Sequence, residues 1–342
     1  MTAALPIRHN FPLRHLNTFG IDAQAHAYLP VTSNTMLDII RRDAQWSTMP
    51  RLVLGGGSNL ILTGDYPGLV LHMATQGIAV IAEDQRFTYV KAAAGENWHR
   101  FVLWTLDHGM GGLENLSLIP GSVGAAPIQN IGAYGVEIKD CFHALTAYDF
   151  KSGELLTLNA ADCGFAYRDS IFKHAFRDRA VILDVTFALP KQWQANLQYA
   201  DVAQELASSG IATPSPSQVS DAVIAIRARK LPDPAKIGNA GSFFKNPVVS
   251  REQRDALLTQ HAQLVSYAQA DGTFKLAAGW LIDQCGWKGK TLGAAGVYEK
   301  QALVLVNRGG AKGRDVTRLA EAIQADVMAR FSVRLEPEPV FV

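Results

Sequence analysis

Short hydrophobic runs, separated by glycine and polar residues, predict a succession of strands in the first third of the chain. We expect strands at residues 52–54, 60–62, 69–72, 78–81 and 87–93. The hydrophobic spacing then changes to three and four residues, with Trp98, Phe101 and Val102 on one face, which predicts a helix over residues 97–109. This mixture of strands and helices is typical of α+β and α/β proteins.

The rest of the chain continues the mixture. A hairpin is expected from strands at 144–150 and 154–158, followed by strands at 181–189, 302–306 and 333–338. Helical spacing recurs over residues 219–226, 276–284 and 316–327. The segment Thr213-Pro214-Ser215-Pro216 is typical of a linker, so we place a domain boundary there.

Two segments expose backbone rather than side chains. Gly55-Gly56-Gly57-Ser58-Asn59 follows the first predicted strand, and residues 113–135 contain many small residues without any period. Consecutive glycines let N–H groups point into one concavity that suits a pyrophosphate, but a hairpin turn would use the same residues. A dinucleotide-binding Gly-x-Gly-x-x-Gly would open a helix, whereas aliphatic residues follow here. Gly289-Lys290-Thr291 is not a P-loop, because Gln284 occupies the required upstream glycine position.

Composition narrows the class of protein. The 342 residues are 48% hydrophobic and 18% charged, which is typical of a folded globular chain of two or three domains. Lys plus Arg is 32 against 31 Asp plus Glu, so no charge excess favours nucleic acid. The three cysteines are widely spaced, which predicts reduced thiols and no zinc site. Residues 1–20 lack a signal-peptide core, and no apolar stretch approaches about 20 residues, so we expect a cytoplasmic protein.

Two further polar groups could carry chemistry. Ser242 lies among glycine, asparagine and alanine without a Gly-x-Ser-x-Gly elbow, so a proton donor is favoured over a nucleophile, and a capping serine is the structural alternative. Arg168 lies between Tyr167 and Asp169, where a surface ion pair would explain it equally well.

Together these segments closely resemble the UDP-N-acetylenolpyruvoylglucosamine reductase family over nearly the whole chain. The most specific strings are Leu54-Gly55-Gly56-Gly57-Ser58-Asn59, Tyr167-Arg168-Asp169-Ser170 and Leu335-Glu336-Pro337-Glu338. Further strings follow in family order at residues 16–20, 95–98, 119–124, 127–135, 230–234, 238–247 and 277–282.

The resemblance implies an α+β fold with a two-part FAD-binding domain of the vanillyl-alcohol-oxidase (PCMH) type. It implies this domain at residues 1–212, in parts 1–76 and 77–212, a substrate-binding α+β domain at 213–332, and a strand at 333–342 that returns to the flavin site. The implied enzyme of peptidoglycan synthesis binds FAD noncovalently, takes hydride from NADPH and reduces the enolpyruvyl group of UDP-N-acetylenolpyruvoylglucosamine to give UDP-N-acetylmuramate. We expect a monomer that binds this UDP-sugar and NADPH but no nucleic acid, membrane or metal.

Residue roles follow from the same resemblance. The cofactor-binding residues that it implies are Gly55, Gly56, Gly57, Ser58, Asn59, Gly121, Ser122, Gly124, Ala125, Ile128, Ile131, Gly132, Ala133 and Ile182. The implied substrate-binding residues are Tyr199, Arg227, Lys230, Asn246 and Gln301, with Tyr199 in the tyrosine loop of the longer subclass. Arg168 and Glu338 match the pair that holds negative charge on the substrate carboxylate, and Ser242 matches the acid that protonates the α-carbon.

The sequence departs from the family pattern at two positions. Val340 stands where a basic residue is frequent, and Ser122 replaces a cysteine of the second flavin segment, which leaves flavin affinity open. One alternative is a flavin oxidase of the same fold, whose relatives often tether FAD through a histidine in the glycine loop, but no histidine lies in this loop. The other is a non-catalytic UDP-sugar-binding protein, against which the presence of Arg168, Ser242 and Glu338 argues.

Overall fold

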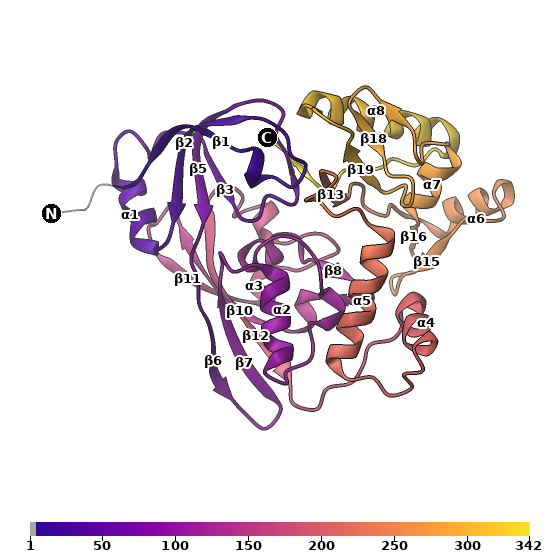
Figure 1. The fold of residues 1–342 in the computed structure, drawn as a ribbon, viewed down its shortest axis with the longest axis horizontal. Coiled ribbons are helices and arrows are strands. Elements are labelled where there is room, and N and C mark those ends of the chain that lie inside the picture. Colours follow the sequence, from indigo (N-terminus) through magenta and orange to yellow (C-terminus); the bar gives the residue numbers. More distant parts are fainter. Residues whose placement is uncertain (1–4) are drawn as a thin grey trace. The chain divides into compact units, whose positions relative to one another are not determined.

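The structure, a computed structural model, describes residues 5–342 of the chain. Residues 1–4, at the start of the first expected domain, lie outside the described residues. Contacts divide the chain into two units, each assembled from distant parts of the sequence (Figure 1). Unit 1 contains the residues up to Phe11, Ala25–Gly57 and Tyr66–Arg229, and unit 2 contains Pro12–Gln24, Ser58–Asp65 and Lys230–Val342.

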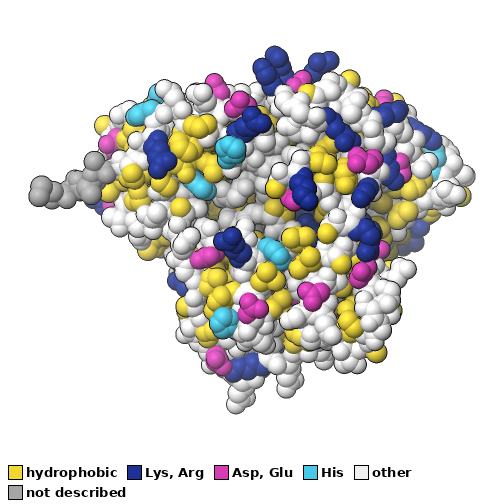
Figure 2. Space-filling view, in the orientation of Figure 1, with side chains coloured by type: hydrophobic (Ala, Val, Ile, Leu, Met, Phe, Trp, Pro, Cys, Tyr) yellow, Lys and Arg dark blue, Asp and Glu magenta, His cyan; other side chains and the backbone are white. Residues whose placement is uncertain are grey.

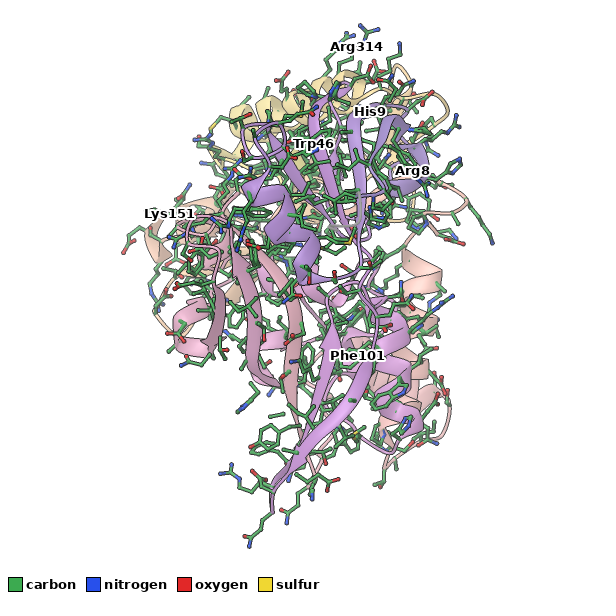
Figure 3. All side chains as sticks on the ribbon, turned by 90° about the vertical axis from the view of Figure 1, so that its left-hand side faces the viewer. Arg8, His9, Trp46, Phe101, Lys151 and Arg314 are labelled. Carbon is green, nitrogen blue, oxygen red and sulfur yellow. The ribbon has the colours of Figure 1, made fainter. Side chains whose placement is uncertain are left out.

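A four-stranded sheet forms the first part of unit 1, in the order β1-β2-β5-β3. Its strands are β1 (Arg8–Pro12), β2 (Gln24–Val31), β3 (Arg51–Leu54) and β5 (Tyr66–Met73), of which β2, β5 and β3 run parallel. Helix α1 (Asn34–Arg42) buries Leu37 and Ile40 against this sheet. The rings of His9 and Trp46, both labelled in Figure 3, lie 6.0 Å apart at its edge.

A five-stranded antiparallel sheet forms the second part of unit 1, in the order β11-β10-β12-β7-β6. Its strands are β6 (Ile78–Glu83), β7 (Phe87–Ala93), β10 (Phe142–Asp149), β11 (Leu155–Asn159) and β12 (Ala180–Pro190). Helix α2 (Trp98–Asp107) packs on this sheet, where Phe101 lies 5.1 Å from Phe187 between ring centroids (Figure 3). Burial of these rings and Trp98 fixes α2, and therefore the segments attached to its first turn, on the sheet.

Shorter elements complete unit 1. They are α3 (Ala160–Cys163), α4 (Ala200–Ser208), α5 (Pro216–Lys230), β8 (Gly132–Ala133), β9 (Val136–Glu137) and the 3₁₀ turns Glu114–Leu116, Val123–Gln129, Ile138–Asp140 and Ile171–Lys173. Val219 and Val223 of α5 pack with Val202 and Leu206 of α4. These contacts group α5, up to Arg229, with unit 1. The domain boundary that we expect at residue 213 stays a prediction.

Unit 2 contains three sheets, ordered β13-β19-β18-β17, β14-β16-β15 and β20-β4. Its strands are β4 (Leu60–Ile61), β13 (Asn239–Ser242), β14 (Val248–Val249), β15 (Ser266–Ala268), β16 (Phe274–Leu276), β17 (Thr291–Leu292), β18 (Ala295–Val297), β19 (Val304–Asn307) and β20 (Val340–Phe341). Its helices are α6 (Arg251–Gln260), α7 (Ala278–Gln284), α8 (Gly313–Phe331) and a 3₁₀ turn at Arg14–Leu16.

Most elements predicted from periodicity are confirmed, including β7, the β10–β11 hairpin, β12, α2, α5 and α8. Three expectations are wrong. Leu276 ends strand β16 rather than starting a helix, because its N–H bonds to the carbonyl of Pro247. Residues 333–338 form no regular strand, and an isolated bridge joins Pro337 to Phe244. The last strand of the chain is β20, which begins two residues after this segment. The glycine run Gly55-Gly56-Gly57 is not a hairpin turn, because the strands on its two sides do not pair with each other. Strand β3 pairs with β5, whereas β4 pairs with β20.

Four observations bear on the expectations drawn from composition. Cys141, Cys163 and Cys285 are free thiols, and burial raises the pKa of Cys141 and Cys163 to about 12, which makes both inert. Within residues 5–342 no cluster of three metal-ligating side chains occurs, and no helix there has the length and apolar character that a membrane crossing needs. Figure 2 shows Lys and Arg interspersed with Asp and Glu on the face drawn.

Candidate active site

The glycine run in unit 1 lies against the backbone of the segment that starts at Gly121. A Cβ on Gly56 would come within 2.8 Å of the Gly121 Cα, and a Cβ on Gly55 would collide with the Ser122 hydroxyl. Gly57 has a φ of +60°, in the left-handed region that favours glycine. The two small-residue segments predicted to bind one ligand are therefore adjacent, and side chains are excluded between them.

The second small-residue segment carries the cofactor candidates between Gly121 and Ala133, and we call it the cofactor segment. Backbone hydrogen bonds fix it on the start of α2. The N–H groups of Val123 and Gly124 donate to the carbonyls of Glu96 and Ala94, both at 2.9 Å, and Trp98 N–H donates to Gly121 at 3.1 Å. Gly124 has no room for a side chain, because a Cβ there would collide with Ala94. These hydrogen bonds hold the segment in place, while the side chain of Ile128 stays exposed.

The remaining cofactor candidates have different surroundings. Ala125, Ile131, Gly132 and Ala133 are half-buried on the same segment, whereas Ile182 is buried in β12, opposite Ala147 of β10. Ile182 belongs to the core of the five-stranded sheet, and its contact with the flavin stays a prediction. Ser58 and Asn59, which continue the glycine run, are half-buried in unit 2.

Arg168 is bound to the same segment of unit 1. Its Nη2 donates to the carbonyl oxygen of Gly132 at 2.8 Å, and its own carbonyl accepts a bond of 2.8 Å from Lys173 Nζ. The φ of Arg168 is +55°, an unusual conformation for arginine that these bonds stabilise. Ser170 Oγ donates to the Ile128 carbonyl at 2.7 Å, so the loop is tied to the cofactor segment at a second point.

The other two catalytic candidates lie close together in unit 2. Ser242 ends β13 and is exposed, and the Glu338 N–H donates to the carbonyl of the next residue, Phe243, at 2.8 Å. Asn59 Nδ2 donates to the Glu338 carbonyl at 3.2 Å, and the Val340 N–H donates to the Asn59 carbonyl at 3.0 Å. The loop after the glycine run therefore helps to hold the backbone of Glu338 beside that of Phe243, the residue after Ser242.

The substrate candidates of unit 2 also have defined partners. Asn246 Oδ1 accepts a bond of 2.9 Å from the N–H of Ala278, at the start of α7. Gln301 Oε1 accepts from Leu303 N–H at 3.3 Å, before β19. Lys230, at the end of α5, is half-buried.

A cluster around Arg227 contains the substrate candidates of unit 1. Arg227 Nε is buried and has no hydrogen-bond partner within the described residues, and burial lowers the pKa of its guanidinium. Tyr134 interacts with this guanidinium, and its ring lies 5.1 Å from the ring of Tyr199 in an edge-to-face arrangement. Sequence reasoning gave Tyr134 no role. Its position between Gly132 and Gly135, in a segment predicted to bind the cofactor, could have indicated that Tyr134 lies near the site.

Two family models match the chain in separate regions. The model described as FAD binding domain matches residues 25–159, and the model described as UDP-N-acetylenolpyruvoylglucosamine reductase, C-terminal domain, matches residues 233–342. The first match covers both small-residue segments of unit 1, and the second covers Ser242 and Glu338.

The residues present fit a flavin dinucleotide. Ser122 Oγ is buried without a hydrogen-bond partner within residues 5–342, next to the glycine run, and a phosphate oxygen would satisfy it. Gly55, Gly56 and Gly121 leave backbone without covering side chains, as a pyrophosphate site needs. The replacement of the family's cysteine by Ser122 therefore retains a polar group at this point.

Curated relatives agree with the two models. The UDP-N-acetylenolpyruvoylglucosamine reductase of Paraburkholderia phymatum is 58% identical and covers 98% of both chains, and that of Burkholderia multivorans is 56% identical, covering 99% of this chain and 97% of its own. The crystal structure of the Thermus caldophilus reductase shares the fold with a TM-score of 0.68 at 22% identity, covering 99% of this chain and 98% of the other. The chain belongs to the UDP-N-acetylenolpyruvoylglucosamine reductase family.

Proposed function

We propose that Arg168, Ser242 and Glu338 carry the family's reaction, the reduction of the enolpyruvyl group of UDP-N-acetylenolpyruvoylglucosamine. When bound, FAD would supply the redox chemistry, the transfer of hydride from NADPH to the β-carbon of the enolpyruvyl group. The protein's own groups must then stabilise the charge that develops on the substrate and protonate the α-carbon. These are the tasks of an electrostatic stabiliser and a general acid.

The observation that carries this proposal is the hydrogen bond that attaches the backbone of Glu338 to Phe243, the residue after Ser242. The Glu338 N–H bonds to Phe243, and Lys245 N–H bonds to the Glu336 carbonyl at 2.9 Å, so a short two-point ladder holds the C-terminal segment against the end of β13. A hydroxyl and a carboxyl group on neighbouring backbones suit a proton donor and a charge-stabilising group that act on one substrate. Ser242 lies on the exposed end of its strand, where a substrate could reach it.

Arg168 suits the carboxylate of the substrate. A guanidinium has five N–H donors in a fixed plane, and its bond to Gly132 orients that plane. Charge-assisted hydrogen bonds from a guanidinium to a carboxylate strengthen as negative charge accumulates there. Arg168 would thus stabilise the charged intermediate of the substrate more than the substrate itself.

We assign the UDP part of the substrate to Tyr199, Arg227, Lys230, Asn246 and Gln301. The buried Nε of Arg227, without a partner among residues 5–342, supports this assignment, because a diphosphate oxygen would supply the missing acceptor. The ring of Tyr199 is oriented by its edge-to-face contact with Tyr134, and Tyr134 in turn interacts with Arg227. We further propose that NADPH is the hydride donor, and that the protein is a cytoplasmic monomer that binds neither nucleic acid nor membranes.

Glu338→Ala and Glu336→Ala form a matched pair for testing the assignment. Glu336 is exposed, and its Oε2 lies 3.3 Å from Lys245 Nζ in a surface ion pair. Glu336→Ala should therefore leave turnover within about twofold of wild type. The purified proteins should be yellow, and NADPH should bleach both variants without air. Glu338→Ala should lose at least about 10²-fold in turnover. Normal turnover in Glu338→Ala would refute its role, and colourless protein that binds no added FAD would refute the function.

A further inference from the structure

His99 holds the residue that leads into the cofactor segment of unit 1. It is the second residue of α2, and its Nδ1 accepts a hydrogen bond of 3.0 Å from the backbone N–H of Leu118. Leu118 has a φ of +58°, a conformation that is strained for leucine. Three residues later the chain reaches Gly121, which lies against the glycine run.

The hydrogen bond determines the protonation state of the ring. A backbone N–H can only donate, so Nδ1 must carry no proton and the hydrogen of the neutral ring is on Nε2. A protonated imidazole has an N–H at both nitrogens and could not accept from Leu118. Protonation of His99 would therefore break the bond and leave two N–H groups facing each other.

The neighbourhood favours the neutral ring. Burial and the charge of Arg227 on α5 both lower the pKa of His99. Residues 116–123, which include Leu118, contain no titratable side chain, and the adjacent charged residue on α2 itself is Arg100. A buried bond of 2.8 Å between Ser117 and Ser220 joins the same segment to α5, one residue before Leu118.

We propose that His99 is a positioning residue for the flavin: its neutral ring holds Leu118 in the left-handed conformation, and protonation of the ring loosens the cofactor segment. The hydrogen bonds of Trp98, Val123 and Gly124 hold that segment further along, so the bond to Leu118 fixes its entry. This inference rests on the assignment of FAD to the segment. It predicts that FAD affinity, and not only turnover, falls as the pH decreases below the ordinary range of histidine titration.

The test compares FAD dissociation constants of the full-length protein between pH 5 and 8, measured by the fluorescence of released flavin. In wild type the constant should rise as the pH falls. His99→Ala should bind FAD about tenfold more weakly at pH 7.5, and its affinity should no longer depend on pH in this range. His99→Asn, whose Oδ1 can accept the Leu118 N–H, should restore the affinity and remain pH-independent. His108→Ala, at the other end of α2, should match wild type throughout.

A double variant separates this role from general damage to the fold. Glycine adopts positive φ without strain, so in a Leu118→Gly background the loss of His99 should matter less than in wild type. Wild-type affinity and pH dependence in His99→Ala would overturn the proposal. So would equal losses in His99→Asn and His99→Ala, or an undiminished effect of His99→Ala in the Leu118→Gly background. Failure of the wild-type protein to bind FAD at any pH would instead refute the proposed function.

Discussion

The Nη2 of Arg168 donates a 2.8 Å hydrogen bond to the carbonyl oxygen of Gly132, which joins the candidate charge-stabilising residue to the candidate flavin segment. The loop that carries Arg168 is tied to the same segment by Ser170 and is braced by Lys173. A movement of the cofactor segment would therefore move the guanidinium with it. We therefore expect cofactor binding and the proposed contact of Arg168 with the substrate to be mechanically linked at this point.

Arg168→Lys tests the need for a planar guanidinium at this position. Lysine retains the charge but cannot contact Gly132 and a carboxylate through one rigid fork. We expect turnover to fall about 10²–10³-fold, while flavin content stays near that of wild type. The measurement is steady-state turnover per bound flavin. Arg177→Lys, which changes an exposed arginine of the same loop, is the control and should retain normal turnover.

Gly56→Ala tests the contact between the two small-residue segments. The added methyl group would lie 2.8 Å from the Gly121 Cα, so backbone must move. Overpacking of this kind costs about 1–3 kcal/mol, which would correspond to FAD binding weakened by about 5-fold to about 150-fold. Gly64→Ala is the control, because no atom lies within 4 Å of its added Cβ. Unchanged FAD affinity in Gly56→Ala, measured by titration of the apoprotein, would show that the segments do not hold the cofactor as assigned.

Asp149 should make the stability of the protein sensitive to acid. Its side chain is 1% exposed, and two hydrogen bonds from Arg179 hold its pKa at about 2, below the ordinary value of 3.8. Because the folded state binds the proton less readily than the unfolded state, the stabilisation is complete above about pH 4. It is lost as the pH falls through 2.

Urea denaturation of Asp149→Asn checks this expectation. At pH 7 the variant should be less stable by about 2–4 kcal/mol, because the Arg179 guanidinium loses its buried charged partner. The difference from wild type should shrink between pH 4 and pH 2, where wild-type Asp149 becomes protonated. Asp178→Asn should have little effect, because that carboxylate is 79% exposed. A stability difference that stays constant down to pH 2 would contradict the linkage.

Periodicity predicted the elements whose stability comes from one buried face. Helix α8 repeats buried residues such as Val316, Leu319 and Ile323 at helical spacing, and β7 alternates buried and half-buried positions, so both were recognisable. Strand β20 was misplaced, because its two residues are stabilised by pairing with β4, and the neighbouring contact of Asn59 with Glu338 spans 279 residues of sequence. Non-local hydrogen bonds of this kind leave no local pattern.

The parts of the candidate site that were predictable are those marked by an unusual local composition. Runs of glycine and other small residues indicated the two backbone segments, but not that Gly56 and Gly121 lie against each other. The left-handed conformations of Leu118 and Arg168 could not be foreseen, because neither residue type favours positive φ. Both backbones are hydrogen-bonded by side chains elsewhere, His99 and Lys173, and the sequence alone does not reveal these contacts.

Ser242→Ala separates the two halves of the reaction, because the proposed acid is needed only after hydride has reached the substrate. The change removes one hydroxyl from the exposed end of β13 and little volume, so folding and FAD binding should be retained. NADPH should bleach the flavin absorbance at close to the wild-type rate, since this step takes no proton from Ser242. Recovery of the absorbance on adding the enolpyruvyl substrate should be slower by about 10²–10⁴-fold, the usual contribution of a positioned general acid.

Ser242→Cys provides the rescue in the same stopped-flow experiment. A thiol has a similar shape and can donate a proton, so this variant should recover part of the rate that alanine loses. If reduced Ser242→Ala is reoxidised by substrate as fast as wild type, Ser242 is not the acid. The residue would then serve only the backbone at the end of β13, and the proton would have to come from another group near Glu338 or from solvent.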